Sequence, residues 1–600
     1  MLLPERMYEV QLLTRREDTE RVIAYLADAK AIHLQDHEKE HVLNTEVDIG
    51  SPLATAEELS DTLTKTRTLL SKLQPSKEPT QDVPVEDRIA RIQTIADKYI
   101  EHEQHLVACE QKMQALHKQQ ELLAHPLPSP LQAIWTAKSV RTILVQASQP
   151  VEVDALTTEQ AGTVTCYVVL AEKEEETLAL LKAAGATIID LEPLRGLTGT
   201  KEEAQQRLKE QLTIAHHDRH HERQRELTFN KHWAFLTESE PILAVELLKA
   251  QAPLHFGATK RATLIKGFVP VKAMGQLEEQ LAPLVVMERK EAVEAPTKLN
   301  NKIKSFEELI KLYTLPKYNE IDPTNVLVIA FPIMFGFMLG DIGYGITLFA
   351  LFAYLGHKIK SIKPFAKIIM LSAVSTIAFG FMYGEIFGME ELFGHHLPYL
   401  IHRIHELPLM FGIAIGIGLL HINIGLLFGI INEARKDGIF FALISKGSWM
   451  LLQAGIALVV FAHDIVPGYT FDKLIAYGVL SLAIAGIIYA EGLRGVFELP
   501  TIMSHTLSYT RLVAVGLASV YLALVVNQMG ADLFAKGGAW LALGFFVIVA
   551  GHAINLALGL LGPFLHSLRL HYAEFFMKFY EGGGTAYVPF GEVMYGIREH

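Results

Sequence analysis

Two apolar segments near the end of the chain each carry one arginine at the depth where lipid is expected. Arg511 lies in the run from Leu499 to Met529, and Arg569 lies in the run from Gly538 to Phe579. An arginine at the centre of a spanning helix costs at least about 2.5–3.5 kcal/mol, so it normally faces a partner or a water-filled path. We therefore expect these two helices to form a polar site inside a membrane domain.

The spacing of the two arginines predicts that they lie at one depth. Arg511 follows Leu499 by 12 residues and Arg569 precedes Phe579 by 10. At about 1.5 Å per residue, both lie roughly 15–18 Å from the same membrane face if the helices are antiparallel. No carboxylate lies within one turn of Arg511, and a guanidinium keeps its charge at any accessible pH. We expect its counter-charge to come from another segment.

One face of the last apolar run is polar or small. Its members recur at alternating spacings of three and four, which places them on one side of a helix: His552, Asn555, Gly559, Gly562, His566 and Arg569. Ser504 and Ser508 precede Arg511 in the same way. The serines, the glycines and Asn555 fit simple contacts between helices equally well, whereas the two arginines favour a functional site.

The two parts of the chain differ in composition. The 600 residues have a formal net charge of −12, and residues 1 to about 320 are rich in Lys, Glu, Gln and His, whereas the rest consists of apolar runs and short polar loops. The N-terminus has no basic region followed by an apolar core, so we predict no secretory signal. Cys109 and Cys166, the two cysteines, fit a reducing cytosol and exclude a disulfide framework or a cysteine-rich zinc site.

Residues 1–320 predict an α+β cytoplasmic domain with two small α/β lobes joined by a long helical hairpin. A strand-helix-strand pattern occurs twice, first at 6–13, 16–29 and 31–36 and again at 262–269, 271–282 and 284–290. Two such units are typical of a split α/β lobe, which residues 1–50 and 255–295 would form. Charged helices with a thin apolar seam predict the hairpin at 55–125 and 200–236, and residues 138–192 predict the distal lobe. The histidine run at 216–221 suggests a metal site, but a solvated helix face explains it better.

Residues 321–600 predict an all-α polytopic membrane domain of about eight helices. The apolar runs lie at 325–355, 365–387, 408–432, 443–463, 473–493, 499–529 and 538–579. Basic loops usually stay cytoplasmic, and they contain Lys358, Lys360, Lys363, Lys367, Arg435 and Lys436. The sequence LGDIGYG interrupts the first run, so two short helices, down and back, reconcile these loops with a cytoplasmic N-terminal domain.

Each of these two helices is short for about 30 Å of hydrocarbon, and Asp341 with its turn must be buried in protein or face water. If the first run forms these two short helices, both chain termini are cytoplasmic, including the tail to His600. The loop that carries four histidines is then outside: His395, His396, His402 and His405.

Four blocks of the membrane half occur in a fixed order: FPIMFGFMLGDIGYG, FGFMYGEIFG, SHTLSYTRLVAVGLA and FLHSLRLHYAEFFMKFYEGGGTAYVPF. Together they resemble the membrane subunit of rotary V-type and archaeal-type ATPases, called subunit a or subunit I. The likeness in architecture covers the whole chain, including the cytoplasmic strut. The sequence motifs are confined to the membrane half.

The resemblance implies a non-catalytic stator in the plasma membrane. It implies three kinds of protein partner: a ring of proteolipid subunits that each hold a membrane carboxylate, peripheral stalks, and a central stalk with an ATPase head. Arg511 matches the characteristic arginine of the family's seventh helix, and Arg569 matches the arginine of its HSLRLH motif. A fixed cation favours the ionised form of a ring carboxylate and blocks leakage between two half-channels. The resemblance therefore makes Arg511 the gate and Arg569 its support.

The candidates for lining the half-channels are polar groups at or near membrane depth: Ser508, His552, Asn555, His566, Glu385 and Glu498, together with Glu491 and His505. Some of these groups are equally compatible with caps or ion pairs at helix ends. Where eukaryotic relatives have a glutamate and a histidine, this chain has Gly559 and Ser519. Either the access route uses other groups, such as His552 and Asn555, or the transported ion differs. The choice between H⁺ and Na⁺ stays open.

The sequence has no GxxxxGK[ST] phosphate loop, so nucleotide chemistry must belong to another subunit. We predict no cofactor, no metal and no nucleic-acid partner. One alternative is a stand-alone secondary transporter, although the membrane half has no internal repeat of the kind that many transporters show. A second alternative is a structural tether, which would leave two buried arginines without a purpose.

Overall fold

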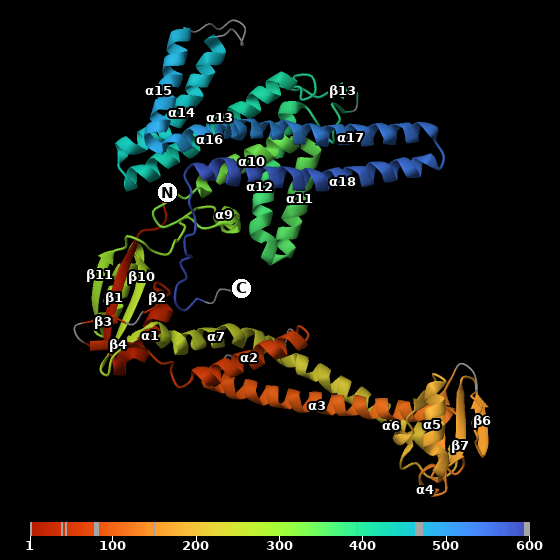
Figure 1. Cartoon of the computed structure of the whole chain (residues 1–600). Coiled ribbons are helices and arrows are strands. Elements are labelled where there is room, and N and C mark those ends of the chain that lie inside the picture. Colours follow the sequence, from red (N-terminus) through yellow and green to blue (C-terminus); the bar gives the residue numbers. More distant parts are fainter. Residues whose placement is uncertain are drawn as a thin grey trace. The chain divides into compact units, whose positions relative to one another are not determined.

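The computed structural model describes residues 3–37, 40–42, 45–76, 83–147, 151–392, 394–462 and 472–592. The chain forms two compact units, one containing residues 1–48 and 255–590 and the other residues 49–254. Figure 1 labels the elements of both. The end of the apolar run 443–463 and the tail beyond residue 592 lie outside the described residues. The division at residue 320 into an arm and a membrane domain stays a prediction.

The first unit contains the predicted split α/β lobe. Its elements are β1 (Met7–Arg15), α1 (Thr19–Ala29), β2 (His33–Gln35), β10 (Ala262–Pro270), α8 (Val271–Leu281) and β11 (Val285–Glu291). In the antiparallel sheet β1 lies between β11 and β10, and β2 pairs with β10. Alternate residues of β1 and β10 are buried because successive side chains of a strand point to opposite faces. The short strands β3 (Glu40–Val42), β4 (Thr45–Ile49) and β9 (Gly257–Ala258) extend this sheet.

The C-terminal tail is bound to this lobe through backbone hydrogen bonds. The Thr297 N–H donates to the Thr585 carbonyl at 2.7 Å, and the Phe590 N–H donates to the Ile32 carbonyl at 2.7 Å. Between them, the Val588 N–H donates to Nδ1 of His33 at 3.0 Å. Residues 585–590 therefore form a strap that continues from the last membrane helix onto the lobe.

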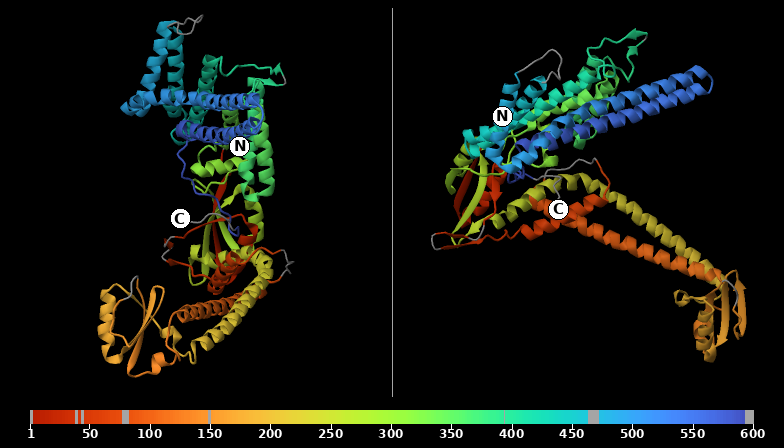
Figure 2. Two further views of the ribbon diagram at one scale, coloured as in Figure 1. Left: turned by 90° about the vertical axis from the view of Figure 1, so that its right-hand side faces the viewer. Right: turned by 45° about the horizontal axis from the view of Figure 1, so that its top comes forward.

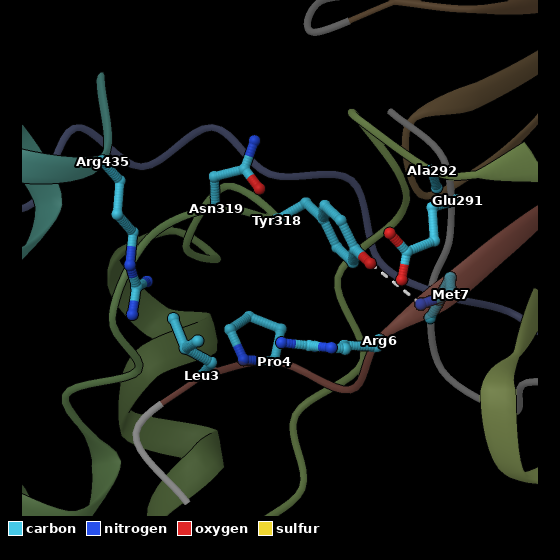
Figure 3. A pocket seen from close by; sticks show the side chains of 9 residues that line it. All are labelled: Leu3, Pro4, Arg6, Met7, Glu291, Ala292, Tyr318, Asn319 and Arg435. Atoms are coloured by element: carbon cyan, nitrogen blue, oxygen red, sulfur yellow. Dashed lines mark hydrogen bonds between the residues drawn. The ribbon is translucent and has the colours of Figure 1, made fainter. Parts of the chain in front are cut away.

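A carboxylate secures the start of this strap. Glu581 accepts hydrogen bonds from Nζ of Lys317 at 2.6 Å and from Nζ of Lys436 at 2.7 Å. These two ammonium groups lower the pKa of Glu581 to about 2. Nearby, the Met7 N–H donates to the Tyr318 hydroxyl at 2.8 Å at the edge of a cavity of about 320 Å³ (Figure 3).

The second unit contains the predicted helical hairpin and distal lobe. Its helices are α2 (Ala56–Lys72), α3 (Val85–Ala124), α4 (Ala133–Thr136), α5 (Glu174–Ala183), α6 (Lys201–Phe229) and α7 (Trp233–Gln251). Helices α3 and α6 run side by side (Figure 2), with Met113, Leu116, Leu208 and Leu212 among the buried side chains of their seam. Four antiparallel strands form the distal sheet in the order β6-β7-β5-β8: β5 (Val140–Gln146), β6 (Thr157–Ala161), β7 (Val164–Leu170) and β8 (Thr187–Ile189).

The histidine run lies on α6, where the ring centroid of His216 is 5.9 Å from that of His117 on α3. His216, His217, His220 and His221 are all exposed. Within the described ranges, no group of three or more His, Cys, Asp or Glu residues is arranged to hold a metal ion. The solvated helix face stays the prediction for this run.

The remainder of the first unit is helical. Its helices are α9 (Glu307–Tyr313), α10 (Thr324–Leu339), α11 (Ile342–Lys358), α12 (Lys363–Tyr383), α13 (Leu407–Lys436), α14 (Ile439–Ala462), α15 (Lys473–Glu491), α16 (Leu493–Leu507), α17 (Arg511–Lys536) and α18 (Trp540–Arg569). Six helical stretches among the described residues are long and apolar enough to cross a membrane. With the shorter α10 and α11, this agrees with the predicted count of about eight, and it confirms the fold class.

The first apolar run is broken where the sequence predicts. Helix α10 ends at Leu339 and α11 begins at Ile342, so at about 1.5 Å per residue each helix is roughly 25 Å long. Asp341 is only 3 % exposed, and its carboxylate accepts hydrogen bonds from the N–H groups of Tyr344 at 2.9 Å and Gly388 at 2.8 Å. The break between α10 and α11 is therefore buried in protein and hydrogen-bonded, as a non-helical segment within a bilayer must be.

Candidate functional site

The helices α17 and α18 form an antiparallel pair (Figure 1), and three contacts give the register of their facing residues. A Cβ at Gly551 would meet Val526, and one at Gly562 would meet Val515. Between these two levels, Ser519 and Asn555 are joined by a hydrogen bond of 3.2 Å. Continued to the end of the pair, this register brings Arg511 opposite the last turn of α18.

Four of the predicted site residues meet at this end. Arg511 is the first residue of α17 and Arg569 the last of α18, and their two positive charges interact electrostatically. His566 lies in the field of both arginines, and Ser508 lies one turn before Arg511. Arg511 is half-buried and Arg569 is exposed. Nη1 of Arg511 is buried and has no hydrogen-bond partner in the described part of the chain.

Glu574 is a buried carboxylate that the sequence reasoning missed. Its Oε2 has no hydrogen-bond partner, and it forms no ion pair with either arginine, in the described part of the chain. This carboxylate is 2 % exposed, interacts electrostatically with Arg511 and Arg569, and lies within hydrogen-bonding reach of Ser508. Two side chains that are five residues apart on an α-helix point in directions about 140° apart. If the α-helix continued, Glu574 would therefore not share a face with Arg569. Residues Leu570–Phe575 instead form a π-helical segment, whose wider turn changes that relationship.

A polar cavity lies between α13, α14, α15, α16 and residues 577–578. Its volume is about 90 Å³, and its lining includes Glu491, Glu498, Lys446 and Lys578. Lys578 lies in the field of Glu574 as well as of both cavity glutamates. The Trp449 indole N–H donates to Oε1 of Glu491 at 3.0 Å, and Nε of Arg494 lies 3.2 Å from Oε1 of Glu498. The predicted residue Glu498 therefore lines this cavity.

His552 and Asn555 belong to a different cluster, further along the α17–α18 pair. The Tyr344 hydroxyl is 2.6 Å from Nδ1 of His552, and Nδ2 of Asn555 donates to this hydroxyl at 2.8 Å. Nε2 of His552 is 2.9 Å from Oδ1 of Asn527, whose Nδ2 donates to the Phe387 carbonyl at 2.8 Å. Tyr344 and Asn527 were not singled out from the sequence, because an aromatic residue or amide in an apolar run is usually part of the core.

Glu385 is separate from both clusters and pairs with a third arginine. Nη2 of Arg403 lies 3.4 Å from Oε2 of Glu385, and both side chains are almost fully buried. The Arg403 guanidinium also donates to the carbonyls of Gly340 at 2.5 Å, Leu339 at 3.2 Å and Gly516 at 3.2 Å. It thus satisfies carbonyls at the end of α10 that have no partner within the helix.

A family model supplies the identity of the chain. The model described as "V-type ATPase 116kDa subunit family" matches residues 131–396 and 497–591. The chain belongs to this family. The matched segments include the α10–α11 break, Arg511 and Arg569. With its long apolar helices, this family member is a multi-pass membrane protein.

Curated relatives extend the match to the full length. The chain is 29% identical to the A-type ATP synthase subunit I of Archaeoglobus fulgidus, over 100% of both chains. It is 34% identical to that of Pyrococcus horikoshii over 50% of this chain and 48% of the relative. The V-type ATP synthase subunit I of Chlamydia trachomatis is 24% identical over 48% and 54%. A crystal structure of the cytoplasmic N-terminal domain of subunit I, homolog of subunit a, of V-ATPase covers 47% of this chain, with 16% identity and a TM-score of 0.29.

Proposed function

We propose that this chain is the stator and ion-translocating subunit of a rotary ATPase of the V-type or A-type. It provides two half-channels to a proteolipid ring and couples ATP hydrolysis or synthesis in a separate head to movement of H⁺ or Na⁺. The observation that carries the proposal is the arginine pair at the end of α17 and α18, with the buried carboxylate of Glu574 beyond α18 and a hydrogen-bonded polar cluster along the two helices.

The two polar groupings lie at different positions along the line of the α17–α18 pair (Figure 1). On one side, Lys578 lines the cavity with Glu491 and Glu498 and lies in the field of Glu574, and Glu574 interacts electrostatically with Arg511. On the other side, Ser519 and Asn555 begin a cluster that leads away from it. Ser519 follows Arg511 by eight residues, which is about 12 Å along an α-helix. This arrangement suits two access routes that do not connect directly.

The arginine pair suits the boundary between these routes. A guanidinium cannot deprotonate in a protein, so it keeps a positive barrier in place while a ring carboxylate passes. It also stabilises the ionised carboxylate that has just released its ion. Arg569 is exposed and is therefore available to a partner, while Glu574 offsets part of the combined charge of the pair.

The membrane orientation follows from the basic loops. Lysines cluster after α11, and Arg435 and Lys436 end α13, so these ends would be cytoplasmic. The lobe, the strap and both chain termini then lie on the cytoplasmic side, in a plasma membrane. The α3–α6 hairpin with its distal lobe would bind the peripheral stalks, which keep the head from turning with the ring.

The test is ATP-driven ion uptake into vesicles that contain the whole complex. We expect Arg511→Lys to abolish uptake while the complex assembles, because lysine keeps the charge but lacks the planar fork. Arg569→Lys should weaken uptake, and Arg435→Lys, at the exposed end of α13, should leave it unchanged. Normal uptake by Arg511→Lys in an assembled complex would contradict the proposal, as would transport by this chain without ring and head.

A further inference from the structure

The turn between α11 and α12, residues 358–367, is called the lysine turn below because of its four lysines: Lys358, Lys360, Lys363 and Lys367. All four side chains are exposed, and none of them forms an ion pair with another described residue. The sequence has no Asp or Glu between Asp341 and Glu385, so both helices approach the turn without a carboxylate. The lysine turn therefore carries a positive charge that the described part of the chain does not balance.

The lysine turn has a fixed position in the fold. Helices α11 and α12 lie side by side (Figure 1) and approach closely near the turn, where a Cβ on Gly356 would be 2.9 Å from Cβ of Ala366. The ring of Phe365 packs edge-on against Phe352 and against Phe564 of α18, with ring centroids 6.1 and 5.2 Å apart. The turn is therefore anchored to the helix that carries Arg569.

The length of α12 places the lysine turn at a boundary of the bilayer. From Lys363 to Tyr383 this helix has 21 residues, which at about 1.5 Å per residue matches the roughly 30 Å of hydrocarbon in a bilayer. Apolar side chains beside the lysines are exposed, namely Tyr354 (61%), Ile359 (43%) and Phe365 (38%). Nζ of Lys358 lies 5.6 Å from the centroid of the Tyr354 ring. Exposed aromatic rings next to lysines are typical of the boundary between acyl chains and headgroups.

We propose that the lysine turn binds the headgroups of anionic phospholipids in the cytoplasmic leaflet. This inference rests on the membrane orientation of the proposed function and adds a ligand that the ion path does not involve. A cluster of lysines directly next to a spanning helix attracts anionic headgroups, and each cation raises the affinity by about fivefold. The lipid phosphates would supply the negative charge that the described residues do not.

A lipid fits the lysine turn better than an acidic protein segment does. A protein segment would balance the lysines but leave the adjoining apolar side chains uncovered. A phospholipid balances the lysines with its headgroup and covers Tyr354, Ile359 and Phe365 with its acyl chains. Cytoplasmic topology accounts for lysines on this side of the membrane, but it does not determine what balances their charge.

The experiment places a reporter beside the lysine turn of the full chain in reconstituted vesicles. Tyr354→Trp introduces a tryptophan there, and its fluorescence is obtained by subtracting that of the chain without this substitution. Lipids with brominated acyl chains quench this fluorescence on contact, and brominated phosphatidylglycerol is compared with brominated phosphatidylcholine. We expect the reporter to show a preference for phosphatidylglycerol of at least about tenfold. Raising the salt to about 1 M, where the Debye length is about 3 Å, should abolish this preference.

Three sets of substitutions are added to the reporter chain. Glutamine at the four positions should abolish the preference: Lys358→Gln/Lys360→Gln/Lys363→Gln/Lys367→Gln. Arginine at the same four positions should retain it, because the charge is kept. The matched control removes four exposed lysines of the second unit and should leave the preference unchanged: Lys112→Gln/Lys118→Gln/Lys182→Gln/Lys209→Gln.

Equal quenching by the two lipids, or an undiminished preference in the glutamine variant, overturns the inference. Glycerol phosphate that removes the preference would show a site for soluble anions instead. A crosslink from the lysine turn to an acidic segment of another subunit, without any lipid preference, would show a protein partner instead. If the glutamine variant does not insert into the vesicles, a preference that persists at high salt overturns the inference. The chain is tested without ring or head, so a complex that fails to move ions contradicts the proposed function and leaves this result unaffected.

Discussion

Arg403→Met should be among the most destabilising substitutions in the membrane half. Arg403 and Glu385 are 1% and 4% exposed, so the substitution leaves a buried carboxylate without its cation. Removing one partner of a buried pair costs about 3–5 kcal/mol. The substitution also frees carbonyls at the end of α10, and each unsatisfied buried group costs about 1–3 kcal/mol more. We expect a loss of at least about 3 kcal/mol in the free energy of unfolding.

The chain offers a matched control and a double-mutant test. Arg494 pairs with Glu498 at 3.2 Å, a distance close to that of the buried pair, but the Arg494 side chain is 87% exposed. Arg494→Met should therefore cost less than about 1 kcal/mol. Replacing Glu385 as well, in Arg403→Met/Glu385→Met, should recover about 1–3 kcal/mol of the loss.

The assay is unfolding of the purified full chain in mild detergent by added dodecyl sulfate, followed by tryptophan fluorescence. The same series should show lower yields of assembled complex for Arg403→Met than for the double variant. If Arg403→Met costs no more than Arg494→Met, burial does not control the energy of this pair, and the role of Arg403 at the end of α10 is refuted.

Three other outcomes follow from the same contacts. Glu574→Gln should lower ATP-driven ion uptake by about tenfold, which corresponds to about 1.4 kcal/mol on the barrier, while the complex still assembles. Uptake equal to that of wild type would show that Glu574 does not belong to the site. Glu581→Gln should speed amide hydrogen exchange at Gly582–Tyr587 and change the unfolding free energy by less than about 1 kcal/mol. Folding lowers the pKa of Glu581 from 4.5 to about 2. The stability that Glu581 contributes is therefore fully present above pH 4.5 and is lost as the pH falls toward 2. Amide exchange at Gly582–Tyr587 that does not change over this pH range would contradict the ion pairs of Glu581 with Lys317 and Lys436. Burial raises the pKa of Cys166 to about 11, so a maleimide at pH 8 should modify Cys109 and spare Cys166 until the chain is unfolded.

Much of the fold follows from periodicity in the sequence. The predicted strand at 262–269 corresponds to Ala262–Pro270, and the predicted helix at 271–282 corresponds to Val271–Leu281. Period-two and period-3.6 patterns of apolar residues dictate these elements because one face of each is buried. The break at LGDIGYG was predictable for a different reason, since charge balance between loops required an extra turn in the membrane.

From the sequence, only those site residues could be predicted whose chemistry is unusual among their neighbours in the chain. An arginine in an apolar run is conspicuous, so Arg511 and Arg569 could be found without a structure, and their closeness follows from helix rise. Tyr344 resembles an ordinary core aromatic until α18 brings His552 beside it. Arg403 lies in a loop, where a charge is expected, and only the tertiary fold buries it. The channel roles of Glu385, Glu498 and the other candidates stay predictions.

The strap at residues 585–590 connects the last membrane helix mechanically to the lobe. Its hydrogen bonds to Thr297 and Ile32 lie across the direction of the chain, so a pull on the lobe loads several bonds in shear at once. Three consecutive glycines, Gly582–Gly584, separate this anchorage from α18. The N–H groups of all three glycines donate hydrogen bonds, to Glu320, Thr314 and Leu315. A pull on the strap is therefore passed to the segment 314–320 before it reaches α18.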